Sequence, residues 1–98
     1  MIAYTRKATR QVTTLRDHYE EKDRPEALAN LAAALNEAER RIERNPGAGL
    51  PAPRPYPALA RPGRAWIKMG RYWIAYSTTA PPVIVGVFYD TADIPGRT

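Results

Sequence analysis

Apolar residues at helical spacing mark two segments in the first half of the chain. In the earlier segment they recur at steps of four, three and four and share one helix face: Ala8, Val12, Leu15 and Tyr19. In the later segment they recur at steps of three and four among alanines, which favour helix: Leu28, Leu31, Leu35, Ala38 and Ile42. Thr5 suits the N-cap of the first helix, and Pro25 suits the first turn of the second. We therefore expect a helical hairpin that ends at residues 45–47, "NPG".

The second half of the chain has the composition of three β-strands, at residues 65–69, 71–78 and 83–90. Gly70 separates the first two, and the sequence "TAPP" separates the last two. Turn residues at these short intervals predict an antiparallel meander. The last two strands lack strict alternation of apolar and polar residues, so we expect both faces of the sheet to be at least partly covered.

The period of two assigns the residues of the middle strand to faces. Trp73 and Ala75 share one face, while Tyr72, Ile74 and Tyr76 share the other. A hairpin of two helices covers only one face of such a sheet. We therefore expect a partner to cover the rest of the second face.

Residues 45–63 contain six of the ten prolines and predict a loop with extended, polyproline-like character. Leu50, Tyr56 and Leu59 are the residues that could hold this loop against the body. A short apolar run at residues 2–5 precedes the first helix, and residues 91–98 form a short polar end. The element order β-α-α-β-β-β predicts a single α+β domain over residues 1–98, with an antiparallel sheet packed against an N-terminal helical hairpin.

Composition removes several classes of chemistry. The sequence has no cysteine and a single histidine, His18, which excludes disulfides, thiolate metal sites and metal sites built from several histidines. Phosphate-binding loops and hydrolase motifs are absent. We expect no metal and no cofactor. No apolar run approaches the roughly 20 residues of a membrane span, and the N-terminus lacks the apolar stretch of a signal peptide. We expect a cytoplasmic protein without a membrane partner.

The net charge of +5 is unevenly placed. Residues 1–50 contain nine Lys/Arg and eight Asp/Glu, whereas residues 51–98 contain six Lys/Arg and only two Asp/Glu. A cationic half favours an anionic partner, either nucleic acid or an acidic protein, with solubility alone as the alternative.

Cations and aromatic residues are interleaved in this basic half. The candidate residues for contact with a target or partner are Arg61, Arg64, Lys68, Arg71, Tyr72, Tyr76 and Arg97. Lys68 and Arg71 flank the turn at Gly70, so we expect them to lie close together. Such a set is typical of single-stranded RNA binding, and Lys68, Arg71 and Tyr89 are the catalytic candidates if the protein is a ribonuclease. The alternative for the aromatic residues is that they form the core of a small sheet.

The whole layout resembles the RelE/ParE superfamily, the toxins of type II toxin–antitoxin modules. Three stretches carry the resemblance: the helix end and loop "IERNPGAGLPAPRPYPALARPG", the strand "GRYWIAYS" and the ending "VIVGVFYDTADIPGR". The ending is similar to that of the ParE branch, the plasmid stabilisation proteins, with Asp93 and Ile94 retained, Tyr89 in place of a histidine and Ala92 in place of a methionine.

The resemblance implies one of two activities. RelE-like members cleave mRNA at the ribosome, whereas ParE-like members inhibit DNA gyrase without nuclease chemistry. In the RelE branch a catalytic arginine lies in the strand where this sequence has Trp73, and another follows the last strand, where this sequence has the acidic "DTAD". These departures favour the gyrase-inhibitor branch, or a member whose target has drifted. The resemblance also implies growth arrest and a hetero-oligomer with an acidic antitoxin. The alternatives are a ribosome-dependent endoribonuclease and a non-toxic member that only binds antitoxin.

Overall fold

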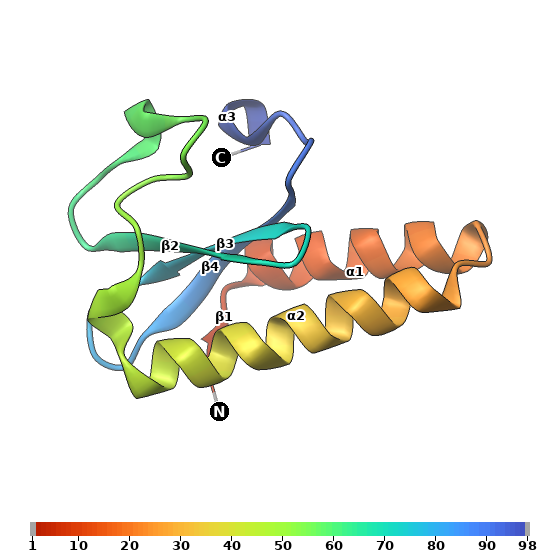
Figure 1. Ribbon diagram of the computed structural model, residues 1–98, viewed down its shortest axis with the longest axis horizontal. Coiled ribbons are helices and arrows are strands. Elements are labelled where there is room, and N and C mark those ends of the chain that lie inside the picture. Colours follow the sequence, from red (N-terminus) through yellow and green to blue (C-terminus); the bar gives the residue numbers. More distant parts are fainter. Residues whose placement is uncertain (1, 98) are drawn as a thin grey trace.

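A computed structural model describes residues 2–97 of the 98-residue chain. Helices and strands follow one another in the predicted order, with a helical turn added at the end (Figure 1). Their bounds are β1 Ala3–Tyr4, α1 Arg6–Glu21, α2 Pro25–Arg44, β2 Arg64–Met69, β3 Tyr72–Ser77, β4 Val83–Tyr89 and α3 Ile94–Arg97. The α+β class is therefore confirmed.

The predicted helical hairpin is confirmed, together with both of its start signals. The Thr5 side chain accepts a hydrogen bond from the backbone N–H of Ala8 at 3.1 Å, as an N-cap residue does. Pro25 occupies the first turn of α2, where its missing N–H leaves no intrahelical bond unmade. Asp23, in the link between the helices, has a positive φ of 50°. The two helices lie side by side and extend beyond the end of the sheet (Figure 1).

The sheet has the strand order β1-β4-β3-β2. Strands β2, β3 and β4 form the predicted antiparallel meander. The expectation of a wholly antiparallel sheet is wrong in one respect, because β1 pairs in parallel with β4. A parallel pair needs a long crossover, and the hairpin of α1 and α2 is part of the connection from β1 back to the sheet.

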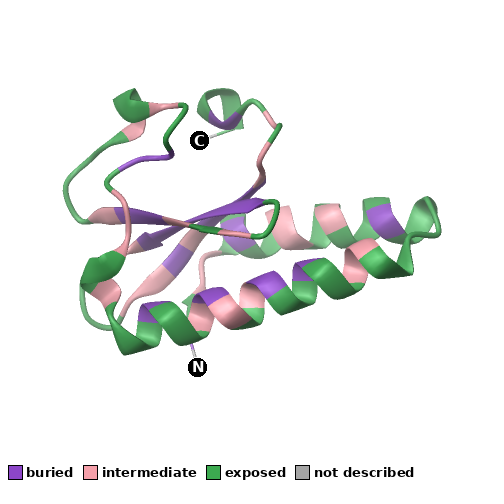
Figure 2. Cartoon of the chain, in the orientation of Figure 1, coloured by how far each residue is buried: buried purple, intermediate pink, exposed green. Residues whose placement is uncertain are grey.

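The hairpin covers one face of the sheet. Ile74 and Tyr76 are almost completely buried in the cluster that includes Ala8, Ala38 and Ile42 from the helices. Tyr72, farther along the same face, packs with Tyr19 and Leu31. These contacts confirm the predicted assignment of Tyr72, Ile74 and Tyr76 to one face. Figure 2 shows that most of the central strand is buried.

The chain's own residues cover the second face of the sheet. The expectation that a partner covers the rest of this face is therefore wrong. Trp66, Trp73, Ala75 and Phe88 are buried there. Leu50, Tyr56 and Leu59 of the proline-rich loop pack against them, as predicted. The loop is less extended than expected, because it contains two 3-10 turns, at Pro46–Ala48 and Pro57–Leu59.

The C-terminal segment also differs from the short polar end that the sequence predicts. It forms the helical turn α3, and its Ile94 side chain is fully buried against the second face. Ile94 is thus a buried apolar residue between the exposed residues Asp93 and Pro95. Among the helices described, none is long and apolar enough to cross a membrane.

Candidate functional site

Lys68 and Arg71 lie close together, as predicted, and both contact one carboxylate. The Lys68 Nζ lies 3.5 Å from Asp90 Oδ2. The Arg71 Nε donates to the same oxygen at 3.1 Å, and its Nη2 lies 3.4 Å from Oδ1. This forked contact raises the pKa of the Arg71 guanidinium. A backbone hydrogen bond from the Asp90 N–H to the Arg71 carbonyl, at 2.8 Å, holds the two residues in register.

Tyr89, the third catalytic candidate, faces the opposite side of the sheet from Lys68. Lys68 pairs with Trp73 and Trp73 with Phe88, whereas the neighbouring row joins Met69, Tyr72 and Tyr89. Adjacent rows of a sheet point to opposite faces. The Tyr89 ring accordingly meets the edge of Tyr72 on the hairpin side, with 5.7 Å between ring centroids, while the Lys68 Nζ lies 5.9 Å from the Trp73 ring on the other side.

Arg71 lies between these two sides, with its guanidinium 5.3 Å from the centroid of the Tyr89 ring. It is the one candidate that contacts both Asp90 and Tyr89. The three catalytic candidates are therefore neighbours, but they do not converge on a common space in front of one face.

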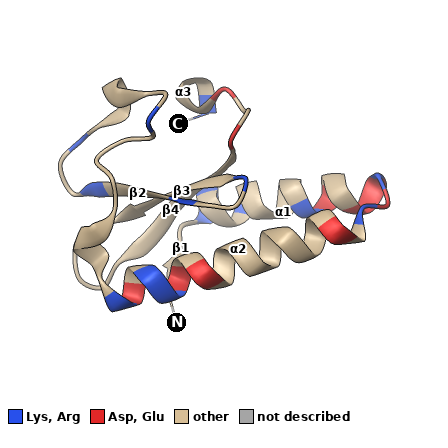
Figure 3. Cartoon of the chain, viewed as in Figure 1, with Lys and Arg blue, Asp and Glu red and all other residues tan. Residues whose placement is uncertain are grey.

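The remaining basic candidates lie elsewhere (Figure 3). Arg64 begins β2 and Arg61 precedes it, and the four residues of strand from Arg64 to Lys68 span about 13 Å. Burial, with a smaller contribution from the Arg61 charge, lowers the pKa of Arg64. Arg97 is in α3. The structure thus separates Arg61 and Arg64 from Lys68 and Arg71.

Tyr72 and Tyr76 are core residues, with only 3% and 1% of their surface exposed. The Tyr76 hydroxyl donates to the Pro46 carbonyl at 2.7 Å, and burial raises the pKa of Tyr76. Tyr76 cannot contact a partner while the loop remains in place. Tyr72 lies at the floor of a groove that the sequence did not reveal.

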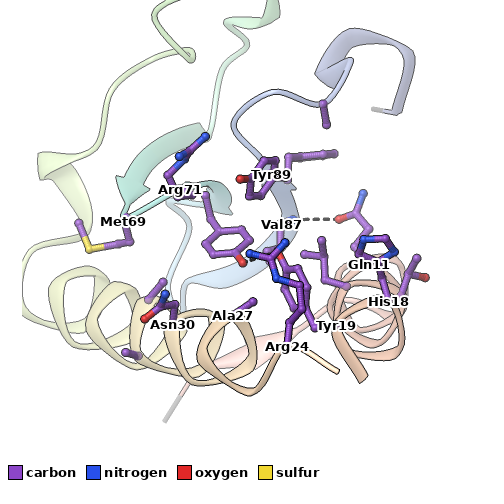
Figure 4. A pocket seen from close by; sticks show the side chains of 18 of the residues that line it. Gln11, His18, Tyr19, Arg24, Ala27, Asn30, Met69, Arg71, Val87 and Tyr89 are labelled. Carbon is purple, nitrogen blue, oxygen red and sulfur yellow. Dashed lines mark hydrogen bonds between the residues drawn. The ribbon is translucent and has the colours of Figure 1, made fainter. Parts of the chain in front are cut away.

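This groove lies between the hairpin and the ends of β3 and β4, and its volume is about 1140 Å³ (Figure 4). We call it the hairpin groove. Its apolar lining includes Leu15, Met69 and Val87. Its lining also contains five Lys/Arg side chains and two acidic ones: Lys7, Arg10, Arg24, Arg71 and Arg97, with Glu26 and Glu37. Glu37 is already paired with Arg40 and Arg41, which lie outside the lining. Arg71 in turn is paired with Asp90, so the lining is cationic by the number of its charged side chains, and Leu15, Met69 and Val87 make part of it apolar.

Gln11 supplies a polar contact inside this groove. Its side-chain oxygen accepts a hydrogen bond from the backbone N–H of Val87 at 2.9 Å (Figure 4). In the sequence, Gln11 lies three residues after Ala8 and four before Leu15, within the apolar stripe of α1. A polar residue in an apolar stripe was the available signal for this contact, but the strand it contacts cannot be inferred from helix spacing.

Among residues 2–97, no three His, Asp or Glu side chains gather as a metal site would require. No model of a known protein family matches this chain, and no curated protein matches it.

Proposed function

We propose that this chain is the toxin of a type II toxin–antitoxin module, that it inhibits DNA gyrase as ParE-like proteins do, and that an acidic antitoxin neutralises it. The support from sequence is the resemblance of the loop, the central strand and the ending "VIVGVFYDTADIPGR" to the RelE/ParE superfamily. The order of the strands and the two-helix hairpin are compatible with such a domain.

The observation that favours a binding protein over a ribonuclease is the position of Asp90. A nuclease of this type would use cations to stabilise the charge that develops on the scissile phosphate. Here Lys68 and Arg71 share a carboxylate that lies where such a phosphate would have to bind. Like charges repel, so Asp90 opposes the entry of a phosphate. Tyr89 faces the other side of the sheet and is poorly placed to exchange a proton there.

The hairpin groove supports the proposed antitoxin. Acidic, amphipathic segments bind grooves that combine an apolar floor with a cationic rim. Charges at the rim mainly raise the association rate, and apolar contacts at the centre slow dissociation. The hairpin groove has both features, and it replaces the second sheet face as the proposed antitoxin site.

The proposal is tested first by toxicity. Expression of the chain alone in bacteria should arrest growth, and co-expression of the protein encoded beside it should restore growth. Normal growth at confirmed soluble expression would contradict an active toxin and leave a chain that only binds antitoxin.

A second experiment separates the two activities. The purified chain should reduce supercoiling by DNA gyrase and should leave mRNA intact on translating ribosomes. The matched controls are Lys68→Ala and Arg71→Ala, which remove the catalytic candidates. Codon-specific mRNA cleavage that both substitutions abolish would replace the proposed function with a ribosome-dependent endoribonuclease.

A further inference from the structure

Two tyrosine hydroxyls meet at the floor of the hairpin groove. The Tyr19 and Tyr72 oxygens lie 2.6 Å apart, although one residue is in α1 and the other in β3. Both side chains are more than nine-tenths buried, with 6% and 3% of their surface exposed. Both residues also belong to the lining of the hairpin groove. The two tyrosines are therefore buried residues that also form part of the groove wall.

The two hydroxyls have two donor protons, and the hydrogen bond between them involves only one. Each phenol carries one O–H donor, and a single hydrogen bond between the two oxygens consumes one of the two protons. Among residues 2–97, the structure gives the second proton no acceptor. A buried donor without an acceptor is costly, so the pair favours a ligand or water that brings one.

The surroundings favour a negatively charged acceptor. The backbone N–H of Arg24 donates to the Tyr19 carbonyl at 2.9 Å, which holds Arg24 beside the pair (Figure 4). Arg24 and Arg71 both line the same groove as the pair. Burial and the hydrogen bond to Tyr19 raise the pKa of Tyr72, so this hydroxyl remains a donor at neutral pH.

We propose that Tyr19, Tyr72 and Arg24 form a receptor for one carboxylate, supplied by an Asp or Glu side chain of a protein segment that lies in the hairpin groove. The inference rests on the proposed function only in taking the partner to be a protein segment. The size of the groove argues for a segment, because about 1140 Å³ greatly exceeds the volume of a single anion. Apolar residues beside the carboxylate would contact Leu15 and Met69. Glu26 in the lining opposes a continuous polyanion such as RNA.

A displayed library of random 14-residue peptides provides the probe. Peptides selected on the wild-type chain should share an Asp or Glu flanked by apolar residues. The double variant Tyr19→Phe/Tyr72→Phe removes both hydroxyls and keeps both rings. It should bind these peptides about 10- to 100-fold more weakly, as expected for a lost hydrogen bond to a charged group. Tyr4→Phe is the matched control, because the Tyr4 hydroxyl bonds Glu39 outside the groove.

A double-mutant cycle identifies the partner of the hydroxyls. Replacing the shared acidic residue of a peptide by Asn or Gln should weaken binding to the wild-type chain, and should have little further effect on the double Phe variant. Thermal melting confirms that both variants are folded before binding is measured.

Four outcomes would overturn the proposal: no peptide enriched on the wild-type chain, selected peptides without an acidic residue, equal binding to the double Phe variant, or tighter binding of a labelled RNA 14-mer than of any peptide. None of these measurements uses gyrase or growth. Their failure is therefore distinguishable from failure of the proposed function.

Discussion

Gln11 of α1 is joined to β4 by a hydrogen bond between its side-chain oxygen and the backbone N–H of Val87, 2.9 Å long. Only Val83 and Ile84 of β4 pair with the short strand β1. Beyond them, the edge of β4 has no strand partner among the described residues, and Gln11 occupies the place of one. Val87 itself is only 2% exposed, and the Gln11 side chain lies in the lining of the hairpin groove.

Substitution of Gln11 by Leu should therefore destabilise the protein. It keeps the apolar stripe of α1 but leaves the buried Val87 N–H without an acceptor, at a cost of about 1–3 kcal/mol in the free energy of unfolding. Gln11→Glu is the control, because a carboxylate can still accept from the N–H. Urea denaturation of the three proteins measures the effect. Equal stability of the Leu and Glu variants would contradict this role of Gln11.

A glycine in the loop after α2 makes a second prediction. A Cβ on Gly49 would lie 2.4 Å from the Tyr76 hydroxyl and 2.9 Å from the Ala65 Cβ. Gly49→Ala should therefore destabilise the fold by about 1–3 kcal/mol, as overpacking of a tight site does. Gly47→Ala is the matched control in the same loop, since its nearest neighbour would be 3.7 Å away.

Removal of the Tyr76 hydroxyl should restore part of the stability that Gly49→Ala loses, because this hydroxyl is the closest atom to the added Cβ. In Gly49→Ala/Tyr76→Phe the closest clash is gone, but the contact with Ala65 remains and the Pro46 carbonyl loses its donor. The double variant should therefore be more stable than the sum of the two single effects predicts, measured by chemical denaturation. Strict additivity would show that the Gly49 position does not depend on the Tyr76 hydroxyl.

Local patterns predicted the elements of this fold, and packing between distant elements determined the rest. The stripes of α1 and α2, the N-cap at Thr5 and the meander follow from spacing and turn residues alone. The parallel pairing of the two-residue strand β1 with β4 depends on tertiary packing, and hydrophobic periodicity does not predict it. Cover of the second face comes from the proline-rich loop and from Ile94, one apolar residue inside a polar segment.

The site was harder to predict for the same reason. Lys68 and Arg71 flank one turn, so their proximity followed from the sequence. The hairpin groove joins side chains from α1, α2, β3 and β4, and the Tyr19–Tyr72 contact spans 53 residues. Residues that meet only after two helices pack on a sheet leave no local signal. Candidates chosen by residue type alone therefore included the fully buried Tyr76.

Alkaline pH provides a third prediction. Burial and hydrogen bonds, to Glu39 and Tyr19 respectively, raise the pKa of both Tyr4 and Tyr72 above the ordinary value near 10. The folded state therefore holds these protons more tightly than the unfolded state. The corresponding stability is fully present below pH 10 and is lost as the pH rises above 10 towards the raised values. Denaturant unfolding between pH 9 and 11.5 should show a steep loss for the wild type and a shallower one for Tyr72→Phe. Identical slopes would contradict the raised pKa.

The last prediction concerns Asp90, whose charge offsets Lys68 and Arg71. Asp90→Asn should strengthen binding of a labelled single-stranded RNA several-fold and increase its salt dependence, because two cations then become available to phosphates. Asp93→Asn is the matched control: it changes the net charge equally, but Asp93 precedes α3 and, among the described residues, forms no ion pair with Lys68 or Arg71. Fluorescence anisotropy at several salt concentrations measures both variants. If the two variants bind RNA equally, the gain reflects net charge alone, and Asp90 does not mask a phosphate site. If only Asp90→Asn gains affinity, the Asp90 carboxylate is what prevents Lys68 and Arg71 from binding RNA phosphates. That result would agree with a protein target for the wild-type chain.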